Sequence, residues 1–130
     1  MVIDTSALLA IFLGEPEADR FDAAIAAAKT KLLPSTCLLE ARMVLVTRRD
    51  ERSVNDLDVW LSKAGVEPMA IDAGIVDRAT EAWLTFGKGR HPASLNFSDC
   101  FSYACAKAAG EPLLFKGNDF PQTDISAAAV

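Results

Sequence analysis

The chain has 130 residues, of which 51% are hydrophobic and 24% charged, so it can bury the core of one domain and is not disordered on composition. Its net charge of −5 argues against nucleic-acid binding driven by overall positive charge, although it is compatible with a nucleic-acid enzyme that has acidic metal ligands and a local basic rim. No apolar stretch approaches the roughly 18 residues that span a bilayer, and the first residues lack the pattern of a secretory signal, so we expect a cytoplasmic single domain over residues 1–130 with no membrane partner.

The first half of the chain alternates short apolar runs with helical patterns. Residues 1–3 predict a buried strand that ends at Asp4, followed by a helix with a Ser or Thr cap that continues through the apolar residues 7–13. Residues 31–34 are too few for a helix and predict a second strand. The other helices expected here are residues 17–29, residues 35–49 with Ser35 or Thr36 as the cap, and a helix that Ser53 opens and Gly65 closes.

The second half continues the alternation. Residues 66–71 predict a third strand, and Pro68 indicates an edge position in the sheet. The remaining expected elements are a helix from Asp72 or Asp77 to Phe86, a loop at residues 87–92, a helix capped by Asn96 and ended by Gly110, a buried strand at 112–115 and a last short strand at 123–125. Strands that alternate with helices predict an α/β fold, a three-layer α/β/α domain with a short, mostly parallel central sheet.

Cysteine and histidine usage excludes several kinds of site. The 3 cysteines are Cys37, Cys100 and Cys105, an odd number without a Cys-x-x-Cys pair, so neither a zinc ribbon nor a redox motif is indicated. We expect them to be buried structural thiols. The single histidine, His91, rules out a His-rich zinc site.

Four acidic residues lie just after predicted strands or near the starts of predicted helices, at one edge of the predicted sheet. Asp4 directly follows the first strand, and Asp119 comes shortly after the strand at 112–115. Asp99 lies in the first turn of a helix, and Glu40 lies one turn into the helix after the second strand. Because the carboxyl ends of parallel strands share one edge, the four side chains can converge there. Carboxylate oxygens are the ligands that Mg²⁺ prefers, so the set predicts a magnesium site.

Each of these acids also has a structural interpretation. Asp4 suits a helix cap, Asp99 suits the positive end of a helix dipole, and Asp119 suits a turn. Glu40 is harder to explain in this way, because it interrupts a nearly continuous apolar run where only a buried salt bridge would satisfy it. Any one of these signals is weak, whereas the set favours a metal site.

The residues around these acids resemble a known family. The chain is similar to PIN-domain nucleases over essentially its whole length, and specifically to the VapC-type toxins of bacterial toxin–antitoxin modules. The resemblance rests on residues 2–7 (VIDTSA), Glu40 within residues 35–42, residues 91–100 (HPASLNFSDC) and residues 114–120 (LFKGNDF). One departure is Ser98, where relatives often carry glycine.

The resemblance implies roles for particular residues. The catalytic acids would be Asp4, Glu40, Asp99 and Asp119, with Asp4 and Asp99 as the most direct ligands of Mg²⁺, or of Mn²⁺, and the other two acting in the first shell or through metal-bound waters. Two further residues, Ser6 and Asn96, would support the site, the first by hydrogen bonding and the second as a polar neighbour. Asp124 also matches a recurrent acid, but its distance beyond Asp119 favours a structural role.

The resemblance also implies an activity and partners. The reaction would be hydrolysis of an RNA phosphodiester by a metal-activated water, leaving 5′-phosphate and 3′-hydroxyl ends. The chain would be the toxin component of its pair and would bind a cognate antitoxin, form a homodimer and take RNA as substrate. The apolar residues of the early helices suit either an antitoxin groove or the core: Leu8, Leu9, Ile11, Phe12 and Phe21.

RNA phosphates need positive charge near the acids. The loop at residues 87–96 holds Lys88, Arg90 and His91 without an acidic residue, and it lies just before Asp99. We predict that these three residues contact RNA, with a solvated loop as the alternative. Further basic candidates are Arg42, Arg48, Arg49 and Lys116.

Two other classes of function compete with a nuclease. A receiver-type phosphoacceptor domain is also α/β with acids at strand ends, but it needs an acidic pair after the first strand, where Asp4 stands alone. The second is a catalytically silent PIN-like module that binds RNA or protein. The acids at all four positions argue against silence, and Mg²⁺ binding tests it directly.

Overall fold

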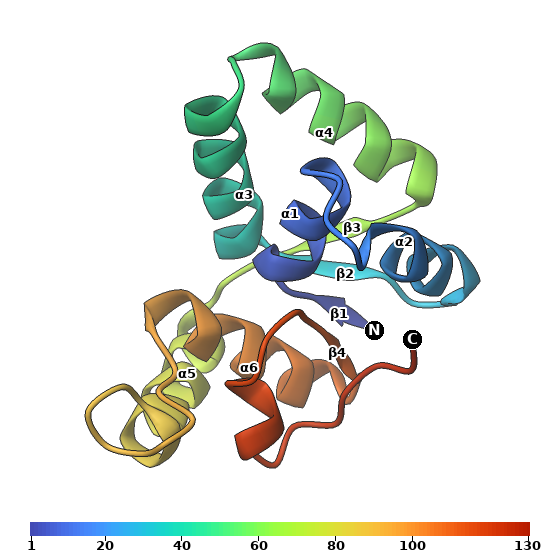
Figure 1. Ribbon diagram of the computed structural model, residues 1–130. Helices are drawn as coiled ribbons and strands as arrows, with labels where there is room; N and C mark the ends of the chain where they lie inside the picture. The colour runs from blue at the N-terminus through green and yellow to red at the C-terminus, as the bar shows by residue number, and fades with distance from the viewer.

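The computed structural model describes residues 1–130 as six helices and four strands (Figure 1). The strands are β1 (Val2–Ile3), β2 (Leu32–Pro34), β3 (Glu67–Met69) and β4 (Leu113–Leu114). The helices are α1 (Thr5–Phe12), α2 (Ala18–Ala27), α3 (Ser35–Arg48), α4 (Arg52–Ala64), α5 (Ala73–Phe86) and α6 (Phe97–Ala109), with a short 3₁₀ helix η1 (Phe120–Gln122). None of these helices combines the length and the apolar character that crossing a membrane requires.

The four strands form one parallel sheet in the order β3-β2-β1-β4. Val2 pairs with Leu32 on one side and with Leu113 on the other, so β1 lies inside the sheet. β3 is an edge strand, as Pro68 predicts, because proline lacks the N–H group that a central strand donates. α1 to α4 cover one face of the sheet and α5 and α6 the other (Figure 1). The predicted three-layer α/β/α arrangement is confirmed.

Neighbouring residues of a strand pack into two separate hydrophobic cores, because successive side chains of a strand point to opposite faces of the sheet. Ile3 and Leu114 are buried against α1 to α4, in one cluster with residues such as Leu8, Phe21 and Leu45. Val2 and Leu113 are buried against α5 and α6, in a second cluster. Leu8 and Phe21, which suited either an antitoxin groove or the core, therefore belong to the core.

The helix ends match the sequence signals in part. Asn96 caps α6 as predicted, and Gly65 and Gly110 end α4 and α6 in the left-handed conformation, with φ of 70° and 64°. α1 is capped by Asp4 itself, whose side chain accepts a hydrogen bond from the Ser6 N–H, so the predicted Ser or Thr cap is wrong there. Asp72 caps α5, which resolves the choice between Asp72 and Asp77.

Three other expectations near helix starts and in the tail are wrong. α3 begins at Ser35 directly after Pro34 without a side-chain cap, because the Ser35 hydroxyl donates to the Met69 carbonyl of β3 instead. α4 begins at Arg52, one residue before Ser53. Residues 123–125 form no strand, because the 3₁₀ helix η1 precedes them and only Ala127 pairs with β4, at Leu113.

Candidate active site

The four predicted acids line one cavity at the edge of the sheet where β1 and β4 end. Its volume is about 250 Å³. The segments that reach it are the residues after β1, the second turn of α3, the start of α6 and the turn after β4. The lining residues are Asp4, Thr5, Ser6, Leu9, Glu40, Asn96, Ser98, Asp99, Lys116, Asp119 and Phe120. We call this space the acid cavity.

Asp4 is the most buried of the four acids, with 4% of its surface exposed. Its Oδ2 accepts hydrogen bonds from the Ser6 hydroxyl at 2.6 Å and from the Ser6 N–H at 2.9 Å, and its Oδ1 accepts one from the Ser102 hydroxyl at 2.5 Å. Burial raises the pKa of Asp4, while the hydrogen bonds from Ser102 and Ser6 act against that rise. Asp4 thus caps α1, as its structural interpretation predicts, and it also lines the acid cavity, so capping does not exclude a role in a metal site.

Glu40 is satisfied by hydroxyl groups rather than by a salt bridge. Its Oε2 accepts a hydrogen bond from the Thr5 hydroxyl at 2.9 Å and a second one from the Ser98 hydroxyl. The structural interpretation of Glu40 required a buried cation, and none pairs with it. Two hydroxyl groups hold the carboxylate in place and leave its negative charge uncompensated.

Asp99 is held by a reciprocal pair of hydrogen bonds at the start of α6. The Asn96 N–H donates to Asp99 Oδ2 at 3.0 Å, and the Asp99 N–H donates to Asn96 Oδ1 at 2.9 Å, which makes a capping box. Burial raises the pKa of Asp99 to about 6, against the Asn96 hydrogen bond and with added repulsion from Asp4, Asp119 and Glu40. The negative charges of the acids therefore act on one another across the cavity.

Asp119 lies at the rim of the cavity. It precedes η1, its surface is exposed, and its side chain accepts no hydrogen bond that would hold it in one place. A side chain in this setting can turn towards a ligand at little cost.

The donor set fits a hard divalent cation held partly through water. No group of three or more His, Cys, Asp or Glu side chains stands ready to hold an ion directly. Mg²⁺ keeps several waters and needs only one or two carboxylates, so acids that share a cavity without touching are suited to it. A bound cation would also relieve the repulsion between Asp99 and the other acids, which adds to the effect of burial on the pKa of Asp99.

Three hydroxyl groups of the site were missed by sequence reasoning: Thr5, Ser98 as a donor to Glu40, and Ser102. Ser102 is fully buried, and its hydroxyl lies 3.1 Å from Cys37 Sγ as well as next to Asp4. The one available signal was helical spacing, because Ser102 follows Asp99 by three residues and so shares a face of α6 with it.

Comparison with known proteins agrees with this geometry. The profile of the PIN domain matches residues 1–126. This chain belongs to the PIN-domain family. The VapC ribonuclease Mb0640 of Mycobacterium bovis is 48% identical over 130 residues, which cover 100% of this chain and 99% of that protein. The identification as a VapC-type PIN domain is therefore confirmed, and the receiver-type alternative is excluded.

Solved structures share the fold at low sequence identity. VapC20 of Mycobacterium tuberculosis, described as a sarcin-ricin loop cleaving toxin, superimposes with a TM-score of 0.76 at 20% identity, covering 95% of each chain. A toxin–antitoxin complex from Klebsiella pneumoniae gives 0.70 at 17% identity, covering 95% of this chain and 92% of that one. At these identities the likeness supports the PIN fold alone.

The PIN domain does not bring the predicted basic loop into the acid cavity. Lys88, Arg90 and His91 are absent from its lining. The Arg90 guanidinium lies 4.2 Å from the centre of the Trp83 ring, and His91 Nδ1 accepts a hydrogen bond from the Ala93 N–H at 3.0 Å. Backbone hydrogen bonds from the Lys88 N–H to the Leu95 carbonyl and from the Leu95 N–H to the Phe86 carbonyl join the two ends of the loop, and Lys88 and Arg90 at its tip are exposed. RNA contact by these residues stays a prediction.

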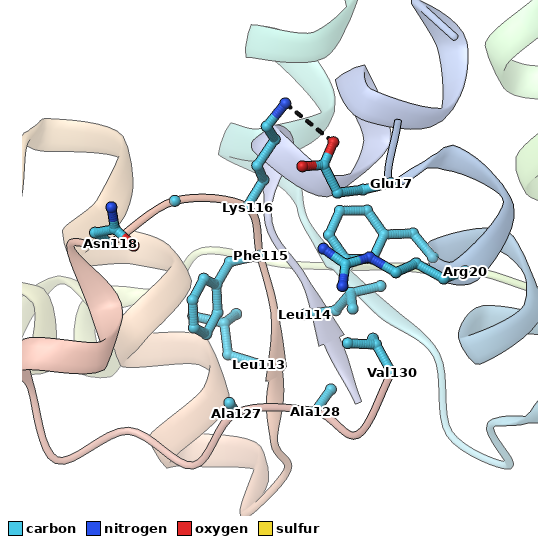
Figure 2. A pocket seen from close by; sticks show the side chains of 12 residues that line it. Glu17, Arg20, Leu113, Leu114, Phe115, Lys116, Asn118, Ala127, Ala128 and Val130 are labelled. Carbon is cyan, nitrogen blue, oxygen red and sulfur yellow. Dashed lines mark ion pairs between the residues drawn. The ribbon is translucent and has the colours of Figure 1, made fainter. Parts of the chain in front are cut away.

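The other basic candidates divide into one inside the cavity and three outside it. Lys116 lines the acid cavity, and its ammonium group pairs with Glu15. It also pairs with Glu17 at 3.1 Å (Figure 2). Arg42 bridges α3 and α4 through Asp58 at 2.7 Å. Arg48 and Arg49 are exposed at the end of α3.

The three cysteines are free and buried. Burial raises the pKa of Cys37 to about 12 and those of Cys100 and Cys105 to about 11. These thiols stay protonated at neutral pH and act as small core residues of the PIN domain.

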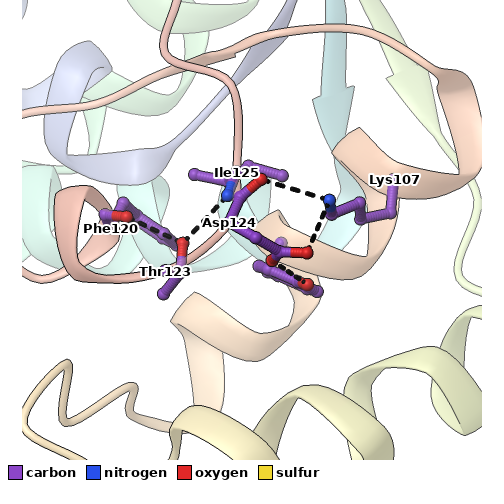
Figure 3. A network of polar contacts seen from close by, with 6 residues as sticks. Lys107, Phe120, Thr123, Asp124 and Ile125 are labelled. Carbon is purple, nitrogen blue, oxygen red and sulfur yellow. Dashed lines mark hydrogen bonds and ion pairs between the residues drawn. The ribbon is translucent and has the colours of Figure 1, made fainter.

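Asp124 lies outside the acid cavity and joins the C-terminal segment to α6 (Figure 3). Its Oδ1 accepts a hydrogen bond from the Tyr103 hydroxyl at 2.5 Å, and its Oδ2 pairs with Lys107 at 3.1 Å. The Tyr103 hydrogen bond, and then Lys107, lower the pKa of Asp124. These contacts agree with the structural role predicted for it.

Proposed function

We propose that this chain is the toxin of a toxin–antitoxin pair and cleaves RNA as a divalent-metal-dependent endonuclease. The observation that carries the proposal is the convergence of Asp4, Glu40, Asp99 and Asp119 on one cavity of a PIN domain. Curated relatives that align with the whole chain are named VapC ribonucleases, which supports RNA as the substrate. The protein would act in the cytoplasm as a single domain over residues 1–130.

Asp4 and Asp99 would hold Mg²⁺, or Mn²⁺, and Glu40 and Asp119 would act in the first shell or through its waters. The bound cation would supply a water of lowered pKa and would neutralise charge on a phosphoryl oxygen. Hydroxyl groups of the chain orient the ligands, because Ser6 and Ser102 donate to opposite oxygens of Asp4. Asn96 likewise orients the Asp99 carboxylate, through the capping box at the start of α6.

Lys88, Arg90 and His91 would extend the RNA-binding surface beyond the cavity. Lys88 and Arg90 are exposed in a loop that contains no acidic residue. His91 would serve as a phosphate or structural contact, since its Nδ1 is already engaged by the Ala93 N–H. Phosphate contacts of this kind are independent of base sequence and weaken as salt rises.

The partners would be a cognate antitoxin and a second copy of the chain. The fold neighbour from Klebsiella pneumoniae is a toxin–antitoxin complex, which supports an antitoxin partner. A homodimer is supported by three large apolar side chains beside the acid cavity, Leu39, Met43 and Phe97, which are 59%, 62% and 80% exposed. Exposed apolar groups that lie together mark protein interfaces.

The deciding experiment is cleavage of total cellular RNA by the purified, partner-free chain in Mg²⁺ and in EDTA, beside an Asp99→Asn variant. We expect discrete products only with metal and with the intact carboxylate, because the amide keeps the shape of the side chain and loses its charge. Circular dichroism of the variant checks that the fold is kept.

The other outcomes separate the alternatives. Full activity in Asp99→Asn would contradict its role as a ligand. Absence of cleavage together with calorimetric Mg²⁺ binding would indicate a narrow substrate missing from the RNA pool. Absence of both would favour the catalytically silent binding module.

A further inference from the structure

Lys116 is the only basic residue that lines the acid cavity. It follows β4, and it also lines a neighbouring cavity of about 410 Å³ together with Glu17 and Arg20 (Figure 2). The residue therefore borders both spaces. Arg42, Lys88 and Arg90 border neither of them.

The backbone of Lys116 is tied to a proposed metal ligand. Its N–H donates to the Ser6 hydroxyl at 2.9 Å, and the same hydroxyl donates to Asp4 Oδ2 at 2.6 Å. This chain of hydrogen bonds sets the start of the lysine side chain close to the carboxylates. The flexible side chain can then reach different partners from a fixed origin.

The ammonium group of Lys116 is held away from the carboxylates that line the cavity. It pairs with Glu15 and Glu17, which lie between α1 and α2. These pairs keep the lysine charged, since hydrogen bonds to Glu15 and then Glu17 raise the pKa of Lys116. The lysine side chain is 36% exposed, and pairs with this much access to water are weak. A phosphate group can therefore compete for the same ammonium.

We propose that Lys116 binds the RNA phosphate at the acid cavity, and that Glu15 and Glu17 hold its ammonium group aside until RNA is present. The inference rests on the proposed ribonuclease function. Four carboxylates repel a phosphodiester, and a lysine next to them lowers that repulsion. While it is paired with the glutamates, the ammonium does not occupy the space of a divalent cation.

The first test compares Lys116→Met and Lys116→Arg with a control, Lys63→Met, which removes an exposed lysine of α4 outside both cavities. Binding of a fluorescein-labelled single-stranded RNA of mixed sequence is measured by anisotropy, with Ca²⁺ in place of Mg²⁺. We expect Lys116→Met to weaken RNA binding about tenfold, and Lys116→Arg to restore most of it. The slope of log affinity against log salt should shrink by about 0.7, the share of one phosphate contact.

Two further results are expected of Lys116→Met and its control. Lys63→Met should bind RNA as the wild type does. Calorimetric Mg²⁺ affinity of Lys116→Met without RNA should be equal to or higher than that of the wild type, because removing a positive charge favours a cation. A loss of Mg²⁺ affinity in this variant would mean that Lys116 supports the carboxylates, and it would overturn the phosphate-binding role.

The double variant Glu15→Gln/Glu17→Gln distinguishes a phosphate-binding role of Lys116 from a purely structural role of its ion pairs. If the glutamates hold the lysine aside, the variant should bind RNA about threefold more tightly. If the ion pairs serve only to hold the segment between α1 and α2 against the end of β4, removing the glutamate charges should weaken RNA binding as much as Lys116→Met does. Weakened binding would overturn the proposal, and unchanged binding would overturn the holding role of Glu15 and Glu17.

RNA binding and cleavage by the wild-type chain distinguish a failure of this inference from a failure of the proposed function. If the wild type neither binds nor cleaves RNA, the ribonuclease proposal fails. If the wild type cleaves RNA and Lys116→Met binds it with equal affinity, only the role of Lys116 fails.

Discussion

At the scale of single residues, the acid cavity depends on hydroxyl groups that hold negative charge in place. Both oxygens of Asp4 accept hydrogen bonds, from Ser6 on one side and from Ser102 on the other. Glu40 accepts two more, from Thr5 and Ser98. Neutral donors can orient a carboxylate without cancelling its charge, so the acids stay available to a cation.

Ser102→Ala tests this dependence. We expect Mg²⁺ affinity to fall roughly tenfold, because Asp4 Oδ1 loses the donor that orients it, and the free energy of unfolding to fall by about 1 kcal/mol. Isothermal titration with Mg²⁺ and urea unfolding measure the two effects. Ser62→Ala, an exposed serine of α4, is the matched control. Unchanged Mg²⁺ affinity in Ser102→Ala would show that Ser102 only fills the core.

At the scale of elements, the start of α6 connects folding with the site. The capping box satisfies the first turn of the helix and at the same time holds the Asp99 carboxylate at the cavity. The sequence predicted this helix from Asn96 as its cap and Gly110 as its end, and the structure adds that Asn96 and Asp99 form a capping box. A local pattern of this kind is readable before any tertiary contact is known.

Asn96→Ala should therefore affect stability and activity together. We expect the free energy of unfolding to fall by about 1 kcal/mol, because the Asp99 N–H loses its acceptor, and RNA cleavage to fall because Asp99 is less well held. Urea denaturation and a cleavage assay measure these changes. Asn55→Ala, on the exposed face of α4, should leave both unchanged, and equal losses in the two variants would contradict a capping role.

At the scale of the whole molecule, the PIN fold leaves an apolar surface beside the acid cavity. Leu39 and Met43 of α3 and Phe97 of α6 lie there, and the Phe97 ring meets the Phe101 ring edge-on, with 5.1 Å between ring centres. Such side chains are costly to leave in water, so a second copy of the chain covering them is the proposal that accounts for them.

Phe97→Glu should turn the proposed homodimer into a monomer, because a buried unpaired charge opposes association. Light scattering after size-exclusion chromatography measures the mass of the particle in solution. Val59→Glu, at a 43% exposed position of α4 away from this surface, should leave the mass unchanged. A wild-type chain that is already monomeric would contradict the homodimer.

The sequence by itself determined the α/β class, the order of the strands and helices along the chain, and the four acids of the cavity. These follow from local signals: the period of apolar residues, the cap at Asn96, and the position of each acid just after a strand or near the start of a helix. It failed at residues 123–125, which follow the 3₁₀ helix η1 and form no strand, while Ala127 pairs with Leu113 of β4 instead.

Only the tertiary structure decided which polar side chains meet. Ser102 reaches Asp4 from 98 residues away, and Lys116 lines the cavity while Lys88, Arg90 and His91 do not. Contacts between distant segments depend on how helices pack on the sheet. The spacing of Asp99 and Ser102 shows that they share a face of α6, but not that this face meets Asp4. The chain thus specified its acids locally, and the packing of its layers specified what surrounds them.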